Sequence, residues 1–135
     1  MSAEPLDELA AAARAWGVEA PIAPIADYLR FVQAENERVN ITADPAWDDL
    51  VLKHASDGLF AVSVLRPLLP PAPKILDLGS GAGFIGVVMK LAWPEAEVTL
   101  MESVERKYRF LSAAAARTRA KGLRVLYARA GAGAP

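Results

Sequence analysis

Apolar residues recur at helical spacing through the first third of the chain. One such pattern covers residues 6–16 and is followed by Gly17, a common helix stop signal. A second pattern covers residues 25–32 and continues to about Arg38. Both patterns predict amphipathic helices that bury one face.

A third helical stretch is predicted to open at Asp44 and Pro45. An aspartate followed by proline has the form of an N-cap and a first-turn proline. The stretch runs through His54, and Gly58 is expected to break or bend it before the apolar residues 59–65. Four prolines between residues 67 and 73 cannot continue a helix and predict a stiff connector.

The pattern changes after the prolines to alternating strands and helices. It predicts a short buried strand at 75–78, a helix at 84–92, a strand at 97–101, a helix at 104–121 ended by Gly122, and a strand at 123–128. This order is a βαβαβ unit of a parallel sheet. We therefore expect an α/β protein with a helical cap and connector at 1–73 and a partial Rossmann-like sheet at 74–135.

Composition limits the class of protein. A chain of 135 residues with 53% hydrophobic residues can form one folded domain with a core. No apolar run approaches the length of a membrane span, and the acidic start of the chain does not resemble a secretory signal, so we expect a cytoplasmic protein. With no cysteine and only His54, we expect no metal site and no cysteine nucleophile. The tail 130–135 is low in complexity.

A glycine cluster follows the first predicted strand and precedes a helix. Glycines let the backbone turn tightly and approach a ligand, and ligands of open α/β sheets bind at the carboxyl ends of the strands. A nucleotide-like cofactor is therefore expected here. The residues predicted to form its loop are Asp77, Gly79, Ser80, Gly81 and Phe84.

Two cofactors fit this loop. Residues 81–86 match the G-x-G-x-x-G pattern of dinucleotide-binding proteins, which would make the chain an NAD-binding oxidoreductase domain. Asp77, Gly79, Gly81 and Gly83 together resemble the acidic-x-Gly-x-Gly-x-Gly loop of class I methyltransferases, which bind S-adenosylmethionine. An acid beside the glycines suits a cationic sulfonium better than a pyrophosphate.

Glu102 ends the second predicted strand, 23 residues after Gly79. A carboxylate at this place can accept hydrogen bonds from both ribose hydroxyls of either cofactor. The alternative is that Glu102, with Glu105, is an acid stabilising the start of the long helix.

Charge is unevenly distributed along the chain. Residues 103–135 contain eight Lys/Arg and one acid, whereas residues 1–102 contain seven Lys/Arg and fifteen acids. Such asymmetry is typical of proteins with an anionic partner, although a solvated helix face would have the same pattern. Phe110 and Leu111 are expected to be buried on this helix and not to stack on bases. The residues predicted to contact RNA phosphates are Arg106, Arg109, Arg117 and Lys121.

Several blocks in order resemble one family over residues 24–130. The blocks are Asn40-Ile41-Thr42, Lys53-His54-Ala55-Ser56-Asp57-Gly58, residues 76–90, Trp93-Pro94-Glu95-Ala96 and Arg106-Lys107-Tyr108-Arg109-Phe110-Leu111. In this order they are similar to the RsmG (GidB) family of bacterial 16S ribosomal RNA guanine-N7 methyltransferases.

The resemblance implies a Rossmann-like methyltransferase with a helical cap, S-adenosylmethionine as donor and the small ribosomal subunit as partner. Gly79 and Phe84 match the family's first cofactor contacts, and Ala130 and Gly131 match a later pair that usually ends in Glu. Ile85 stands where the family usually has proline. Family members are longer, so the resemblance also implies a C-terminally truncated member, or a noncatalytic nucleotide- or RNA-binding half-domain.

Methylation at guanine N7 needs no general base, because that nitrogen already has a free lone pair. The sequence therefore identifies no catalytic residue. His54 and Asp57 are spaced to share a helix face and to hydrogen-bond. We expect this pair to join helices or shape the pocket.

Overall fold

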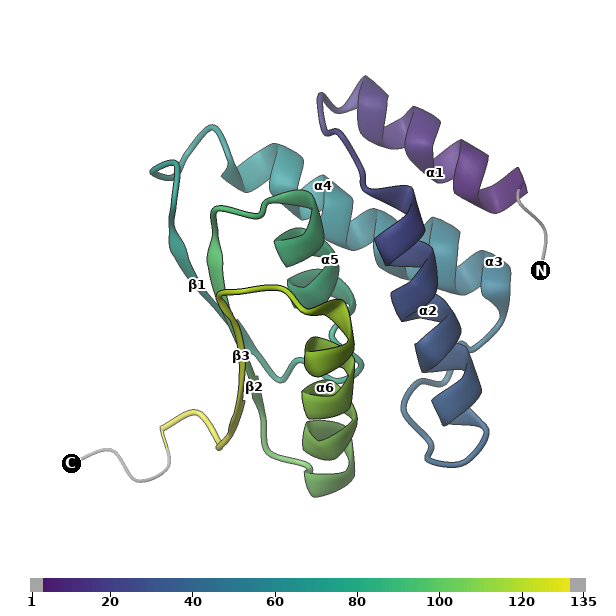
Figure 1. Ribbon diagram of the computed structural model, residues 1–135, viewed down its shortest axis with the longest axis vertical. Coiled ribbons are helices and arrows are strands. Elements are labelled where there is room, and N and C mark those ends of the chain that lie inside the picture. Colours follow the sequence, from purple (N-terminus) through teal and green to yellow (C-terminus); the bar gives the residue numbers. More distant parts are fainter. Residues whose placement is uncertain (1–3, 132–135) are drawn as a thin grey trace.

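The computed structural model describes residues 4–131, which form two groups of elements (Figure 1). No helix in this part of the chain combines the length and apolar character needed to cross a membrane. The helical segment precedes a mixed segment of strands and helices. In chain order the elements are α1 (Glu4–Ala15), α2 (Ile22–Asn36), α3 (Trp47–Asp49), the π-helix η1 (Leu50–Ala55), α4 (Ser56–Leu65), β1 (Lys74–Leu78), α5 (Phe84–Ala92), β2 (Glu97–Glu102), α6 (Glu105–Thr118) and β3 (Leu123–Tyr127).

The first two helices confirm the helical pattern of the sequence. Leu9 and Ala13 of α1, and Ile25, Leu29 and Val32 of α2, are almost completely buried. After α2, the Asn36 side chain accepts hydrogen bonds from the next loop's backbone. The apolar spacing therefore identifies the buried faces of both helices correctly.

The third helical stretch differs from the prediction at its start and at Gly58. Helix α3 begins at Trp47 with Ala46 as N-cap, so the predicted Asp44 cap is wrong. The Asp44 carboxylate instead accepts a hydrogen bond from Lys53 Nζ at 3.1 Å. The irregularity expected at Gly58 lies earlier, in the π-helical turns of η1, and α4 is continuous through Gly58.

The predicted βαβαβ unit is confirmed. The three strands are parallel in the order β1-β2-β3, with α5 and α6 as the two crossovers. Helix α5 has the predicted bounds. The connector before β1 is held by Trp93, which is buried and donates its indole N–H to the Pro71 carbonyl at 3.2 Å. Buried residues of the helical segment and of the sheet's covered face form one cluster.

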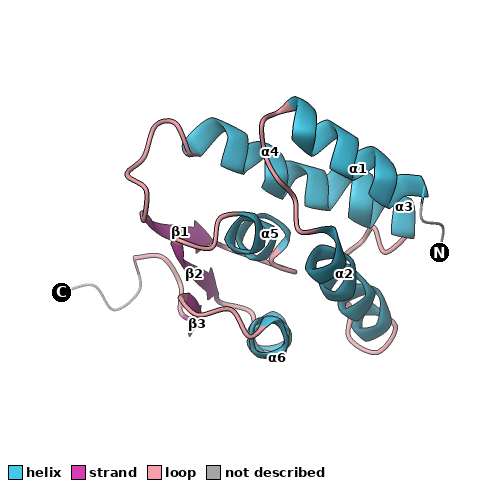
Figure 2. Ribbon diagram, turned by 45° about the horizontal axis from the view of Figure 1, so that its top comes forward, coloured by secondary structure: helices cyan, strands magenta, loops and turns pink. Residues whose placement is uncertain are grey.

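All helices of the described residues lie on one side of the sheet, and α5 and α6 pack against it while α4 and α2 pack against these two helices (Figure 2). Residues Val98 and Leu100 face α5 and α6 and are buried, whereas Leu76 and Leu78 on the opposite face are 51% and 57% exposed. The expectation of a buried first strand is therefore wrong for that face. Its apolar residues suit burial on both sides, but the described residues cover only one.

Helix α6 ends earlier than predicted. Its last residue is Thr118, and Arg119 follows in the left-handed conformation with φ 57°. The Thr118 hydroxyl accepts a hydrogen bond from the Ala120 amide at 3.2 Å, which turns the chain toward β3. Lys121 consequently lies beyond the helix and not on its face.

Candidate functional site

The glycine loop joins β1 to α5 at the carboxyl end of the sheet. Gly79, Gly81 and Gly83 all have positive φ, at 62°, 60° and 84°. A Cβ built on Gly79 or Gly81 would meet nothing within 4 Å, so the backbone at these two residues borders open space. Positive φ explains why glycine is favoured there, and the open space leaves room for a ligand to reach the backbone.

The inner side of the loop is tied to the end of β2. The Ser80 amide donates to the Met101 carbonyl at 3.0 Å, and the Gly81 amide donates to Glu102 Oε1 at 2.8 Å. The Ser80 hydroxyl donates to the Asp77 main-chain carbonyl at 2.9 Å. These bonds bring Asp77, Ser80, Gly81 and Glu102 together, as the sequence predicts.

Glu102 is buried, with 5% of its surface exposed, and both carboxylate oxygens are used. Oε1 accepts from Gly81, and Oε2 accepts from the Val104 amide at 2.9 Å. Val104 is the N-cap residue of α6, so Glu102 both positions the loop and stabilises the helix start. Each carboxylate oxygen has a second lone pair, so it can still accept a hydrogen bond from a ribose hydroxyl.

Asp77 is half-buried between the loop and α5. Its Oδ2 accepts a hydrogen bond from the Gly86 amide at 3.2 Å, in the first turn of α5. Burial raises the pKa of the Asp77 carboxyl, and the neighbouring Ser80 hydroxyl and, to a smaller extent, the Gly86 amide oppose this rise. A nearby positive charge would be favourable for such a carboxylate, which fits a sulfonium ligand.

The raised pKa of Asp77 predicts a pH-dependent stability difference. Between its ordinary and raised pKa the folded chain binds this proton and the unfolded chain does not, so unfolding free energy falls as pH rises. The Asp77→Asn variant carries an amide that cannot ionise and that keeps an acceptor for Gly86. We expect the variant to gain stability relative to wild type between about pH 4 and about pH 7 in urea unfolding.

The exposed Asp48 provides the control for this experiment. Asp48→Asn should show no comparable gain between the two pH values, because its carboxyl is solvated in both states. A pH-independent difference between Asp77→Asn and wild type would contradict the assigned burial of Asp77.

Phe84, Ala130 and Gly131 lie outside this hydrogen-bonded group. Phe84 is the half-buried first residue of α5. Ala130 and Gly131 are exposed and follow β3, whose end is joined to β2 by a hydrogen bond from the Ala128 amide to the Glu102 carbonyl at 3.1 Å. Residues 132–135 of the low-complexity tail lie outside the described residues.

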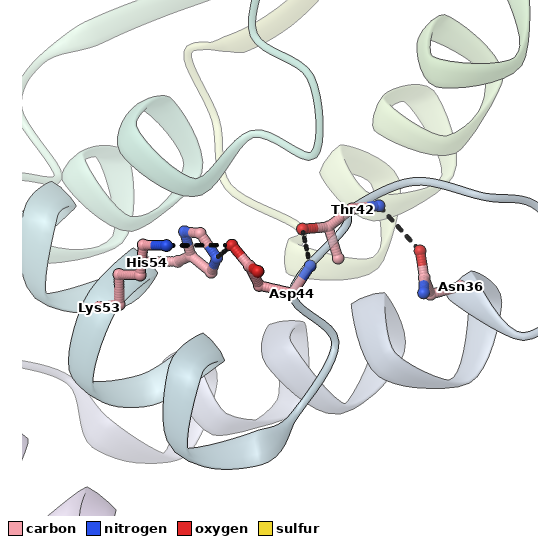
Figure 3. A network of polar contacts seen from close by, with 5 residues as sticks. All are labelled: Asn36, Thr42, Asp44, Lys53 and His54. Carbon is pink, nitrogen blue, oxygen red and sulfur yellow. Dashed lines mark hydrogen bonds and ion pairs between the residues drawn. The ribbon is translucent and has the colours of Figure 1, made fainter.

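His54 lies close to the loop and has a different acidic neighbour from the predicted one. Its ring stacks on Phe84, with centroids 4.2 Å apart and planes at 8°. Its Nε2 is 3.5 Å from Asp44 Oδ2, an ion-pair distance when the imidazole is protonated (Figure 3). Asp57 is exposed in α4, so the predicted His54–Asp57 pair is replaced by His54–Asp44.

The sequence predicted Asp44 as a helix N-cap, but in the structure its carboxylate pairs with Lys53 and His54. Lys53, by its hydrogen bond first and its charge second, lowers the pKa of the Asp44 carboxyl, and His54 contributes less. The loop that carries Asp44 is ordered by Thr42, whose hydroxyl oxygen accepts from the Asp44 amide at 3.2 Å (Figure 3). Asp44 thus joins the loop after α2 to η1.

The predicted RNA-contacting residues separate into three places. Arg106 and Arg109 line a groove of about 310 Å³ between the end of α2 and the start of α6, together with Arg38. Arg117 donates from Nε and Nη2 to the two carboxylate oxygens of Asp27 of α2, at 3.0 and 3.1 Å. Lys121 is exposed beyond α6. The four residues therefore do not form one continuous stripe.

Within the groove the arginines have local partners. Arg109 pairs with Glu105 at 2.6 Å, and Arg106 donates from Nε to the Asn40 carbonyl at 3.3 Å. The Arg109 side chain is 75% exposed. Exposed ion pairs of this kind contribute little, so a phosphate could replace the Glu105 carboxylate at small cost.

No group of three or more His, Asp or Glu residues that could hold a metal ion occurs among residues 4–131. The expectation that the chain has no metal site stays a prediction. Phe110 and Leu111 are buried in the core, in agreement with their predicted place on the inner face of α6.

The topology and the loop define a class of protein. A parallel βαβαβ unit with a glycine loop after β1, an acid at the end of β2 and a helical N-terminal segment is the Rossmann-like fold of class I methyltransferases, present here as a three-stranded part. The chain belongs to the GidB family, rRNA small subunit methyltransferase G, whose family model matches residues 22–134.

Curated relatives with the name Ribosomal RNA small subunit methyltransferase G match most of the chain. The protein of Myxococcus xanthus (strain DK1622) is 41% identical over 92% of this chain and 57% of its own length. The protein of Moorella thermoacetica (strain ATCC 39073 / JCM 9320) is 37% identical over 81% of this chain and 45% of its own length. The chain thus spans about half the length of the curated relatives it matches.

One solved structure has a weaker likeness. It is a putative protein-L-isoaspartate O-methyltransferase beta-aspartate methyltransferase from Plasmodium falciparum in complex with S-adenosyl-L-homocysteine. The likeness has a TM-score of 0.41 and 16% identity, and covers 75% of this chain and 62% of the other.

Proposed function

We propose that this chain supplies the S-adenosylmethionine-binding part of a cytoplasmic enzyme that methylates N7 of a guanine in bacterial 16S ribosomal RNA. The family match over residues 22–134 is the observation that carries this proposal. Residues 74–135 would bind the cofactor, and residues 1–73 would form its helical cap and connector.

The loop residues divide the work of holding this cofactor. Glu102 would accept hydrogen bonds from the ribose hydroxyls, while the backbone at Gly79 and Gly81 borders the open space that a ligand can enter. The Asp77 carboxylate would favour the positive charge of the methionine part. Phe84, Ala130 and Gly131 would contact the remaining parts, including the adenine.

When bound, S-adenosylmethionine supplies a methyl group activated by the positive sulfonium. Guanine N7 has an in-plane lone pair and no proton, so the protein needs no general base. What the protein must do is hold N7 in line with the methyl group, at near-attack distance and without competing water. Such positioning can supply most of the rate acceleration.

The RNA would meet the face next to the cofactor loop. Arg106 and Arg109 belong to the first turns of α6, which begins just after Glu102. With Arg38 they would contact phosphates beside this loop. Arg117 in the last turn of α6 and the exposed Lys121 beyond the helix would contact phosphates further along the RNA. Phosphate contacts of this kind hold the substrate and make binding sensitive to salt.

Calorimetry with S-adenosylhomocysteine and with NAD tests the cofactor. The proposal expects binding of the first compound and not of the second. Binding of NAD alone would identify an oxidoreductase domain and overturn the proposal. Transfer of a labelled methyl group to small ribosomal subunits that lack the modification tests the activity.

A second candidate is a noncatalytic nucleotide- or RNA-binding half-domain. The chain spans about half the length of the curated relatives it matches. This second candidate predicts binding of S-adenosylhomocysteine without transfer of label. Transfer above background by the 135-residue chain would exclude it.

A further inference from the structure

Tyr28 of helix α2 contacts the glycine loop directly. Tyr28 is 2% exposed, and its hydroxyl donates a hydrogen bond of 2.5 Å to the main-chain carbonyl of Ala82. The two residues are 54 positions apart in the sequence. A buried tyrosine hydroxyl needs a partner, and here the partner is the loop itself.

This bond and a second hydrogen bond hold both ends of the peptide unit between Ala82 and Gly83. The Ala82 carbonyl accepts from Tyr28, and the Gly83 amide of the same peptide donates to the Ser80 carbonyl at 2.8 Å. Gly83 is the N-cap of α5 and has a φ of 84°. Because a peptide unit is planar, holding both ends sets how the loop turns into the helix.

Two side chains of the N-terminal helical segment contact Phe84, the residue after Gly83. The Tyr28 ring lies edge-on to Phe84, with centroids 6.4 Å apart. The His54 ring stacks on Phe84 at 4.2 Å. The end of the glycine loop is therefore held by side chains from α2 and η1, which precede the sheet in the chain.

We propose that Tyr28 is a positioning residue for the cofactor loop, so that binding of an adenosyl ligand depends on the hydrogen bond from its hydroxyl to Ala82. This inference rests on the proposed cofactor. Tyr28 holds the loop in the conformation that leaves the backbone at Gly79 and Gly81 facing open space. Without the hydroxyl, part of the binding free energy would be used to order the loop.

The variant Tyr28→Phe tests this inference, because it removes only the hydroxyl. We expect its dissociation constant for S-adenosylhomocysteine to rise roughly tenfold in calorimetry, as for the loss of one buried hydrogen bond. We also expect faster hydrogen exchange at the Gly83 amide in the ligand-free chain. The control is Ile25→Val, which removes one buried methyl group from the preceding turn of α2.

The control separates positioning from general destabilisation. Ile25→Val should keep wild-type affinity and wild-type exchange at Gly83. Unchanged affinity and exchange in Tyr28→Phe would overturn the inference. If the wild-type chain does not bind S-adenosylhomocysteine, the proposed cofactor fails, and faster exchange at Gly83 in Tyr28→Phe alone would still support the loop-holding role.

Discussion

Replacing Glu102 by alanine is expected to lower the free energy of unfolding by about 2–4 kcal/mol and to abolish measurable binding of S-adenosylhomocysteine. The buried carboxylate accepts hydrogen bonds from the Gly81 and Val104 amides. Glu102→Ala leaves both donors without their acceptor in a buried place. It also removes the proposed ribose contact.

Glu105→Ala is the matched control for this prediction. Glu105 lies three residues further on, at the start of α6, and its side chain is 59% exposed and paired with Arg109. We expect a stability loss below about 1 kcal/mol and unchanged affinity, because exposed ion pairs contribute little.

Chemical denaturation and calorimetry on both variants separate the two roles of Glu102. If Glu102 only stabilises the start of α6, Glu102→Ala will lose stability and keep its affinity. Retained affinity would therefore contradict the proposed ribose contact. A loss of both quantities is the expected result.

Local sequence patterns predict the helices and strands because the type and bounds of each element depend mainly on nearby residues. Helix α5 has the predicted bounds, because Gly83 is its N-cap and an apolar helical face follows this glycine. The position of the acid-and-glycine loop between a strand and a helix predicts its place at the carboxyl end of β1. The Asp77, Ser80, Gly81 and Glu102 contacts follow from this placement and from the parallel order of β1 and β2.

Contacts between distant elements could not be predicted, because helical spacing shows which residues share a face and not what covers that face. Arg117 and Asp27 are 90 residues apart, and the pattern gave no sign of their pairing. The apolar spacing marks Tyr28 as a core position, but the partner of its hydroxyl depends on the tertiary structure.

The His54–Asp57 pairing failed for a different reason. Spacing of three residues brings side chains together only in a regular α-helix. Here His54 belongs to the π-helix η1, which has more residues per turn, and Asp57 belongs to α4. The change in helix type alters the relative direction of the two side chains, and Asp44 from the preceding loop lies beside His54 instead.

The exposed face of the sheet shows a related limit. The apolar residues of β1 have the composition of a strand that can be buried on both sides. Composition cannot tell whether both sides are covered. In residues 4–131 the helices cover one side, and Leu76, Leu78 and Leu126 remain exposed on the other.

Gly58 explains how closely the helical cap approaches the sheet's first crossover helix. The sequence suggested a break at this glycine, but α4 continues through it and packs against α5. A Cβ on Gly58 would lie 2.7 Å from Val88 Cβ and 2.8 Å from the Phe84 carbonyl oxygen. Neither atom is the end of a flexible side chain, so the two helices would have to move apart.

We therefore expect Gly58→Ala to lower the free energy of unfolding by about 2 kcal/mol, because overpacking of up to about 3 kcal/mol exceeds a helix-propensity gain of about 1 kcal/mol. Asp57→Ala, at the neighbouring exposed position of α4, should change it by less than about 0.5 kcal/mol. Denaturant unfolding of both variants measures the difference. A Gly58→Ala chain more stable than wild type would mean that propensity outweighs packing, and that α4 and α5 are not in the close contact described.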